Sequence, residues 1–492
     1  MILAVLIILL LIGGLLCWLL EQWNKVLPKW IALFSATGGL LLTVFICLQY
    51  TNGVRNSSGW FINYQLSWIP SFGISFHLAL DGLSLVMLLL TFFLGILAVL
   101  CSWNEIKEKQ GFYFFNLLWT LAGICGVFVA MDLFLFYFFW EVMLVPMYFL
   151  IAIWGDANRR YASYKFFLFT QAGGLLMLLA ILALYFMHAA QTGIYSFDYF
   201  DLLHTSPGAA AKWIMMGFLF AFMVKLPVVP LHNWLPDAHG EAPTGGSLIL
   251  AGLLLKTGAY GIIRFVITLF PQQAQALAWW AMLLGAIGIL YGAFLAFAQT
   301  DLKRLIAYTS VSHMGFVLLG IFAFNEIAMD GVVMQILTHG ISTGALFVIA
   351  GMLKERLHTR DINQMGGLWT AIPLMGGMTM VFTMAALGLP VLGSFIAEFL
   401  VLMGAFSTNA ALTVWATLGL IFSAFYALRM MQKVFLGPPT VTVPLKDMSA
   451  REYIMMAALT ISIIVLGLFP QPVINMVKDI AGVLVIKQAP AH

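Results

Sequence analysis

The sequence predicts an all-α polytopic membrane protein with about fourteen transmembrane helices. The chain of 492 residues is 62% hydrophobic and only 9% charged, which is too little polar surface for a soluble domain of this size. Apolar runs of about 20 residues, the length that crosses a bilayer, recur along the whole chain. Basic residues gather in alternate loops between these runs, as the positive-inside rule requires.

The expected spans follow directly from the apolar runs. They are residues 2–20, 30–50, 81–103, 112–130, 132–154, 164–188, 212–231, 244–270, 276–299, 301–323, 329–352, 371–403, 410–435 and 452–472. The first run has neither a basic start nor a small-residue cleavage site, so we expect a span and not a signal peptide. The odd-numbered loops carry most lysines and arginines, for example Lys107, Arg159 and Arg360. This predicts cytoplasmic odd loops and two periplasmic termini.

One sizeable loop, residues 51–80, lies outside by this scheme. Apolar and polar side chains alternate from Ile62 to Trp68 and again from Ile74 to Leu80, with the turn Pro70-Ser71-Phe72-Gly73 between them. Period-two patterning around such a turn predicts a β-hairpin. Because an isolated hairpin is only marginally stable, we expect it to rest on a neighbouring protein or on helix ends.

Two predicted spans contain a Leu-Pro break, at Leu226-Pro227 in the seventh and Leu389-Pro390 in the twelfth. Proline removes a backbone donor, so Pro227 should leave the carbonyl of Met223 without its helical partner. The two spans are five apart in the chain, and five is odd, so they run in opposite directions. Paired broken helices in opposite orientation are typical of inverted-repeat transporters.

Six titratable residues fall well inside apolar spans, where a centred charge costs about 2.5–3.5 kcal/mol unless it is paired or functional. They are Glu141, Lys225, Lys256, His313, His339 and Glu398. Plainer interpretations exist for several of them. Glu141 could form a structural ion pair, Lys225 could reach the membrane surface, and a lone histidine could hydrogen-bond a neighbouring helix. Arg264, near the end of its span, is expected to reach the surface in the same way.

A glutamate and lysines in lipid can handle protons. A nearby carboxylate favours the charged lysine, and separation of the pair favours release of its proton. We therefore interpret the six residues as a proton path, with water in the broken-helix regions completing the links. Four polar residues follow the first break, His232, Asp237, His239 and Glu241, and we expect these near the cytoplasmic mouth.

Other chemistry is not indicated. The four cysteines, Cys17, Cys47, Cys101 and Cys125, stand far apart in apolar runs. No phosphate-binding glycine loop and no histidine pair with metal or haem spacing is present. We therefore expect no metal, no redox cofactor and no hydrolytic site in this chain. A net charge of +3 does not favour nucleic acid as a partner.

Five long motifs resemble one known family closely. They are FLFYFFWEVMLVPMYFLIAIWG (134–155), KLPVVPLHNWLPDAHGEAPT (225–244), LLLKTGAYGIIR (253–264), QTDLKRLIAYTSVSHMGFV (299–317) and LGLPVLGSFIAEF (387–399). The family is the antiporter-like membrane subunits of bacterial respiratory complex I, the proton-translocating NADH–quinone oxidoreductases. The resemblance covers nearly the whole chain and is nearest to the subunit M, or chain 4, type. Glutamate at position 398 favours that type over the L type.

The resemblance implies fourteen helices, two inverted five-helix repeats and one proton channel. It divides the chain into residues 1–111 (three helices and the hairpin), 112–270 (first repeat), 271–435 (second repeat) and 436–492 (last helix and tail). The family's channel glutamate, two lysines and acidic residue of the twelfth helix fall on Glu141, Lys225, Lys256 and Glu398. Its channel histidine falls on His313, and His339 is expected on the same axis.

The implied function is proton translocation across the bacterial inner membrane as part of NADH:quinone oxidoreductase. FMN, iron–sulfur clusters, NADH and quinone would be bound by partner subunits, with antiporter-like subunits as neighbours on both sides. Three alternatives stay open on sequence alone: a multisubunit Na⁺/H⁺ antiporter, a membrane-bound hydrogenase or formate complex, and a structural scaffold without transport. One departure from the family pattern is Glu241, an extra acid that either tunes proton uptake or is merely solvated.

Overall fold

A computed structural model describes residues 1–51, 59–439 and 444–486, which are mostly helical. The chain begins with α1 (Ile2–Leu20), α2 (Leu27–Thr51), α3 (Gly82–Glu105), α4 (Gln110–Val129), α5 (Leu133–Trp154), α6 (Arg159–Thr192), α7 (Tyr199–Leu202), α8 (Ala211–Lys225) and α9 (Trp234–Glu241). One long helix comprises α10 (Thr244–Ile249), η3 (Leu250–Leu254), α11 (Leu255–Gly261), η4 (Ile262–Val266) and α12 (Ile267–Leu269). The rest is α13 (Pro271–Ala298), α14 (Leu302–Ile321), α15 (Glu326–Leu357), α16 (Leu368–Ala371), α17 (Pro373–Ala386), α18 (Gly393–Thr408), α19 (Ala410–Val434), α20 (Ala450–Leu468) and α21 (Gln471–Ile486).

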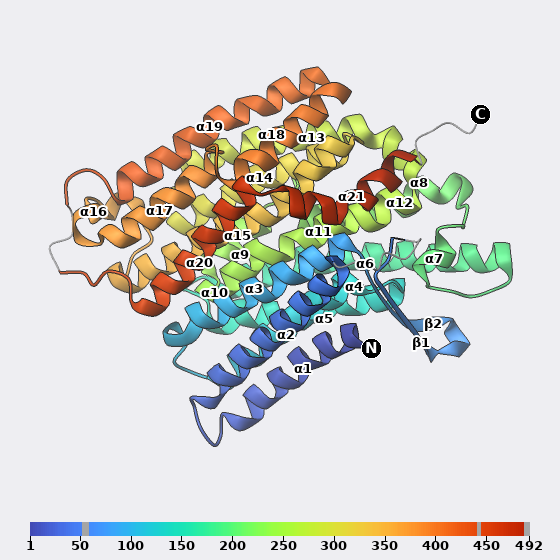
Figure 1. Ribbon diagram of the computed structural model, residues 1–492, viewed down its shortest axis with the longest axis horizontal. Coiled ribbons are helices and arrows are strands. Elements are labelled where there is room, and N and C mark those ends of the chain that lie inside the picture. The colour runs from blue at the N-terminus through green and yellow to red at the C-terminus, as the bar shows by residue number, and fades with distance from the viewer. Residues whose placement is uncertain (52–58, 440–443, 487–492) are drawn as a thin grey trace.

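The expected membrane spans are confirmed. Among the described residues, thirteen helices are long and apolar enough to cross a bilayer. The shorter apolar helices α17 and α18 together occupy the remaining expected span. The long helices lie side by side along a common direction, with the hairpin and the N-terminus at one end and α16 at the other (Figure 1). Helix α21, after the last expected span, was not predicted; it packs against α3 and α15.

The centre of the bundle consists of α14, α15 and the long helix from α10 to α12. The most apolar stretches of α10–α12 and α15 are completely buried, and that of α14 is 89% buried. By contrast, α1, α2 and α20 expose about two thirds of theirs to the surroundings. Helices that are apolar on all sides and buried by protein are the place where a charged side chain can be kept from lipid.

The hairpin is confirmed at the predicted place. Strand β1 (Ile62–Ile69) pairs antiparallel with β2 (Ile74–Leu80), with Ile62 opposite Leu80, and the short 3-10 helix η1 (Pro70–Phe72) forms the turn. The hairpin rests on helix ends of its own chain, as one of the two expectations had it. The amide of Met131 donates to the carbonyl of His77 at 2.9 Å, and Leu78 bridges Ala130.

Three buried polar side chains fasten the hairpin to the loops before α5 and α7. His77 Nδ1 pairs closely with the Asp198 carboxylate, and His77 Nε2 lies 2.6 Å from Asn63 Oδ1. Asp132 accepts from the amides of Phe134 and Leu135 at 2.9 and 3.0 Å and so caps α5. Its second oxygen accepts from the Ser75 amide at 2.9 Å. One carboxylate thus joins the start of a helix to β2.

Asp132 should make stability depend on pH. Burial raises the pKa of this carboxyl from 3.8 to about 6, although its hydrogen bonds with Ser75 and Leu135 oppose the shift. The folded protein therefore binds this proton more tightly than the unfolded chain, so the free energy of unfolding falls as the pH rises from about 4 to about 6. We expect the thermal midpoint of the purified protein to fall over this range, and Asp132→Asn to reduce the slope. An unchanged slope in Asp132→Asn would contradict the assignment.

Both proline breaks are confirmed. Helix α8 ends at Lys225, and the chain is not regularly helical again until α9 at Trp234. The carbonyl of Met223 does have a partner, because the amide of Val228 reaches back to it at 3.0 Å. The Trp234 indole donates to the carbonyl of Val224 at 2.9 Å. A wider turn and a side chain thus satisfy carbonyls that the break frees.

The second break repeats the first in the opposite sense. Helix α17 ends at Ala386 and α18 begins at Gly393, with Gly388 and Val391 at positive φ between them. Two isolated β-bridges recur at the same interval: Asp132 pairs with Asp198 beside the start of α5, and Asp301 pairs with Asp361 beside the start of α14. The helices α5 and α14 are the fifth and tenth spans. Matching β-bridges beside spans that are five apart support the two inverted five-helix repeats.

Candidate functional site

Four of the predicted residues meet in the buried centre of the bundle. Lys256 Nζ, on α11, lies 2.6 Å from His339 Nδ1 on α15. The rings of His339 and His313 are 5.6 Å apart between centroids. On α14, His313 Nδ1 lies 3.0 Å from Glu398 Oε1 of α18. All four side chains are buried. They form one line across four helices, which we call the central line.

The local helix geometry helps to position Lys256. It lies two residues after the end of η3, a π-helical turn that interrupts the long helix from Thr244 to Leu269. Its ammonium donates to the carbonyl of Ala251, five residues earlier, as well as contacting His339. A π turn changes the direction in which the next side chains point, and such turns are frequent at functional sites. The lysine thereby points into protein, not toward lipid.

Lys225 lies at the other side of this helix, at the last residue of α8. It is completely buried, and within the described residues its ammonium has no hydrogen-bond partner. Instead Nζ lies over the rings of Trp140 and Phe166, at 5.4 and 5.3 Å from their centroids. Aromatic faces attract a cation without fixing it as a carboxylate would. Lys225 is therefore buried and does not reach the surface.

Glycine brings the two lysine helices together. A Cβ at Gly258 would lie 2.6 Å from the carbonyl oxygen of Phe222 and 2.8 Å from the amide of Leu226, which is closer than real side chains come to backbone. Gly258 is two residues after Lys256, and the contacted backbone flanks Lys225. Only a residue without Cβ lets α11 approach the end of α8 this closely.

Glu141 and Lys225 are not in direct contact. The structure places Glu141 partly exposed on α5, where its Oε1 accepts from Gln171 Nε2 at 3.4 Å. The two charges interact electrostatically, but no ion pair joins them in the part of the chain that is described. Rearrangement of a side chain or a helix would be needed to close the pair.

Two residues that contact the central line escaped sequence reasoning. Tyr426 of α19 is buried, and its hydroxyl lies 3.4 Å from His313 Nε2. Gln335 Nε2 lies 3.5 Å from Glu398 Oε1. The signal for Gln335 was present, because it precedes His339 by four residues and so shares its helix face. Tyr426 carried no such signal, since tyrosines are common near the ends of spans.

The four residues expected at the mouth lie in different surroundings. Asp237 is paired with Lys165 Nζ at 2.6 Å and with Arg304 Nη1 at 2.9 Å. Glu241 is buried and accepts from the Asn158 amide at 2.7 Å. His232 packs edge-on against the Tyr291 ring at 5.3 Å between centroids.

His239 is completely buried and stacks on the Phe347 ring, 4.4 Å between centroids.

Burial excludes the interpretation of Glu241 as merely solvated. Its Oε1 faces Arg360 Nη2 at 3.4 Å, and the same guanidinium contacts Asp156 at 2.9 Å and Asp301 at 3.0 Å. Arg360 therefore forms ion pairs with the loop after α5, the end of α9 and the cap of α14. Charge-assisted contacts of this kind fix where helix ends lie.

The expectation for Arg264 was wrong. Its side chain does not reach the surface but is buried with only 6% exposed. The guanidinium forms a close ion pair with Asp81, the cap of α3, and lies 4.8 Å from the centroid of the Trp60 ring. Its Nε donates to the Tyr260 hydroxyl at 3.2 Å. The partner Asp81 lies in the loop before α3, 183 residues away, so no local pattern links them.

Comparison with known proteins identifies the family. Residues 130–423 match the family model described as NADH:quinone oxidoreductase/Mrp antiporter, TM. NADH-quinone oxidoreductase subunit M of Pseudomonas aeruginosa is 51% identical over 487 residues, covering 97% of this chain and 96% of that protein. The chain belongs to the subunit M family. Subunit M of Escherichia coli is 49% identical over 494 residues, covering 98% of this chain and 97% of the relative.

A solved structure agrees with this membership of the subunit M family. A chain of respiratory complex I from Thermus thermophilus with bound NADH superposes with a TM-score of 0.87 at 31% identity. The match covers 99% of this chain and 100% of that chain. The family model alone includes the Mrp antiporters, and the identity to subunit M over nearly full length is what separates the two.

Proposed function

We propose that this chain is the proton-translocating subunit M of an NADH-quinone oxidoreductase. It moves protons across the bacterial inner membrane, driven by electron transfer from NADH to quinone in other subunits. The observation that carries the proposal is the central line. Its four buried side chains follow one another in space, in the order Lys256, His339, His313 and Glu398. Intramembrane ionisable residues that contact one another are typical of proton relays.

The proposed roles follow the order of contacts. Glu141 and Lys225 form the switch: approach of the glutamate favours the charged lysine, and its withdrawal favours transfer of the proton toward Lys256. Lys256 hands the proton to His339, which can bind it at one ring nitrogen while releasing another from the second. His313 continues the transfer to Glu398. His232, Asp237, His239 and Glu241 lie on the cytoplasmic side, where the ion-paired Asp237 and Glu241 position helix ends around the path.

In the proposed arrangement this subunit is a translocase component without a redox centre of its own. FMN, iron–sulfur clusters, NADH and quinone belong to partner subunits, and antiporter-like subunits flank it on both sides. Both termini and the hairpin are periplasmic, in agreement with the basic odd-numbered loops. The proposed units remain residues 1–111, 112–270, 271–435 and 436–492, of which the middle two each carry one broken helix.

The deciding experiment measures NADH-driven quinone reduction and proton pumping together, in inverted membrane vesicles carrying Lys225→Ala in the complete complex. We expect both rates to fall at least about tenfold, because proton pumping and electron transfer are coupled and a higher activation barrier for one slows the other. Lys212→Ala, an exposed lysine on the same helix, is the matched control and should behave like wild type. Normal pumping in Lys225→Ala would refute the proposal. Normal NADH oxidation with loss of a sodium-dependent antiport would assign the chain to the antiporter class instead.

A further inference from the structure

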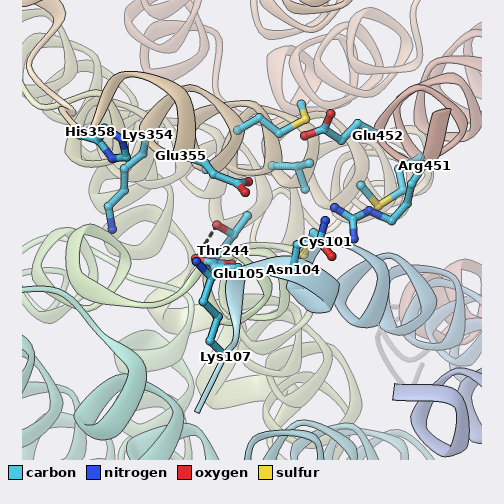
Figure 2. A pocket seen from close by; sticks show the side chains of 14 residues that line it. Cys101, Asn104, Glu105, Lys107, Thr244, Lys354, Glu355, His358, Arg451 and Glu452 are labelled. Atoms are coloured by element: carbon cyan, nitrogen blue, oxygen red, sulfur yellow. Dashed lines mark hydrogen bonds between the residues drawn. The ribbon is translucent and has the colours of Figure 1, made fainter. Parts of the chain in front are cut away.

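A charged cavity opens at the end of the bundle opposite the hairpin, where α3 and α15 end and α10 and α20 begin. Figure 2 shows the side chains that line it. Its volume is about 230 Å³, which is room for several waters. Lys107, Glu355 and His358 in its wall are exposed, so the cavity communicates with solvent. In the proposed orientation this end faces the cytoplasm.

Glu105 holds a defined place in this cavity. Its carboxylate accepts from the Thr244 amide at 3.1 and 3.2 Å and from the Thr244 hydroxyl at 3.0 Å. Figure 2 shows this contact between the end of α3 and the start of α10. An acid that lines a solvent-connected cavity and is held by a helix start is well placed to exchange protons with water.

A buried lysine lies directly behind this contact. Lys303 is 1% exposed, and its ammonium donates to the carbonyl of Ala242 at 2.7 Å, two residues before Thr244. It interacts electrostatically with the carboxylates of Glu105 and Asp156. Glu105 therefore helps to compensate a charge that would be costly in the protein interior.

His239 is the next ionisable residue from Lys303 toward Lys256. Neither of its ring nitrogens has a hydrogen-bond partner among the described residues, although the side chain is completely buried. Its electrostatic neighbours are Lys303 on one side and Lys256 on the other. A buried polar ring without a partner costs free energy, and such a group is explained most simply by a function.

We infer that this cavity is the proton-collecting vestibule of the subunit, and that Glu105, Lys303 and His239 deliver protons from it to Lys256. The inference rests on the proposed function and specifies where its protons are taken up. Glu105 takes a proton from hydronium in the cavity, leaving water. Lys303, now compensated less strongly, releases its own proton through His239 to the neutral amine of Lys256. Glu105 then reprotonates Lys303, so one proton moves inward in each cycle.

The ion pairs around the other acids agree with this assignment. Asp237 contacts two cations, and Glu241 forms an ion pair with Arg360, so both carboxylates are committed to fixing helix ends. Within the described part of the chain, Glu105 instead accepts hydrogen bonds from neutral groups of Thr244, and its interaction with Lys303 is electrostatic. Of the four residues first expected at the mouth, His239 is the one that this route uses.

The test is Glu105→Gln in the complete complex in inverted vesicles. Glutamine keeps an oxygen that accepts from Thr244, so a purely structural role would survive, whereas proton exchange would not. We expect proton pumping and quinone reduction to fall at least about tenfold, the lower end of what a positioned proton-transfer group contributes. Glu105→Asp should recover part of the activity. Glu355→Gln, in the same cavity wall, is the matched control and should pump like wild type.

Assembly is checked by native electrophoresis and by NADH oxidation with an artificial acceptor that bypasses quinone. Wild-type pumping in Glu105→Gln, or an equal loss in Glu355→Gln, would overturn the vestibule assignment. If Glu105→Gln does not assemble, Lys303→Met decides, and wild-type pumping there would also overturn it. Because Lys225→Ala is measured alongside, the two proposals can fail separately: loss in Lys225→Ala alone leaves the function standing without this vestibule.

Discussion

Lys256→Leu will abolish coupled proton pumping while the complex still assembles. The substitution removes the amine that contacts His339 and breaks the central line at its start. Leucine is close to lysine in volume and apolar, so the buried site loses a charge and gains no void. We expect the pumping rate to fall by about two orders of magnitude or more, since a missing proton-transfer group costs that much. The measurement is the acidification of inverted vesicles after addition of NADH.

Two further variants make the result specific. Thr257→Val changes the next residue, whose hydroxyl only caps the carbonyl of Leu254 at 2.7 Å, and should leave pumping within about twofold of wild type. His339→Gln should resemble Lys256→Leu, because an amide cannot pass a proton from one side to the other. Pumping at the wild-type rate in Lys256→Leu would show that protons bypass the central line.

Arg264→Leu will destabilise the protein strongly. Asp81 would be left buried and charged, and among the described residues it would keep its capping contact with the Ser84 amide at 2.9 Å. Removing one partner of a buried ion pair typically costs about 3–5 kcal/mol, because the remaining charge is uncompensated. We expect a lower thermal midpoint of the detergent-purified complex and less assembled complex in membranes.

The double variant Arg264→Leu with Asp81→Asn separates the charge from the packing. Asparagine still accepts from the Ser84 amide and carries no charge, so most of the lost stability should return. If the double variant is as unstable as Arg264→Leu, the loss comes from the contacts of the guanidinium with Trp60 and Tyr260 instead.

The sequence was sufficient for those features that depend on local pattern. Apolar runs predicted the spans, the Leu-Pro pairs predicted both breaks, and alternation around Gly73 predicted the hairpin. Helix length, proline geometry and strand period act over neighbouring residues, so a single chain reveals them. The carbonyl of Met223 shows the limit, because its partner Val228 depends on how the chain turns after the break.

Contacts between distant helices could not be predicted in this way. The sequence indicated that Lys256, His339, His313 and Glu398 are unusual, but not that they form one line. It missed Tyr426, and it placed Arg264 at the surface because the partner Asp81 is in another part of the chain. The separation of Glu141 from Lys225 likewise depends on side-chain positions that no spacing rule describes.

The two Asp–Asp bridges have a consequence for biosynthesis. Asp132 pairs with Asp198, and Asp301 with Asp361, so each bridge closes within one proposed repeat. The bridge of each repeat can therefore form soon after the helices of that repeat leave the ribosome, before the other repeat is complete. The contact of Lys256 with His339 instead joins the two repeats. We expect the central line to be completed only when the second repeat docks, so a partly inserted chain holds no continuous proton conductor that could leak.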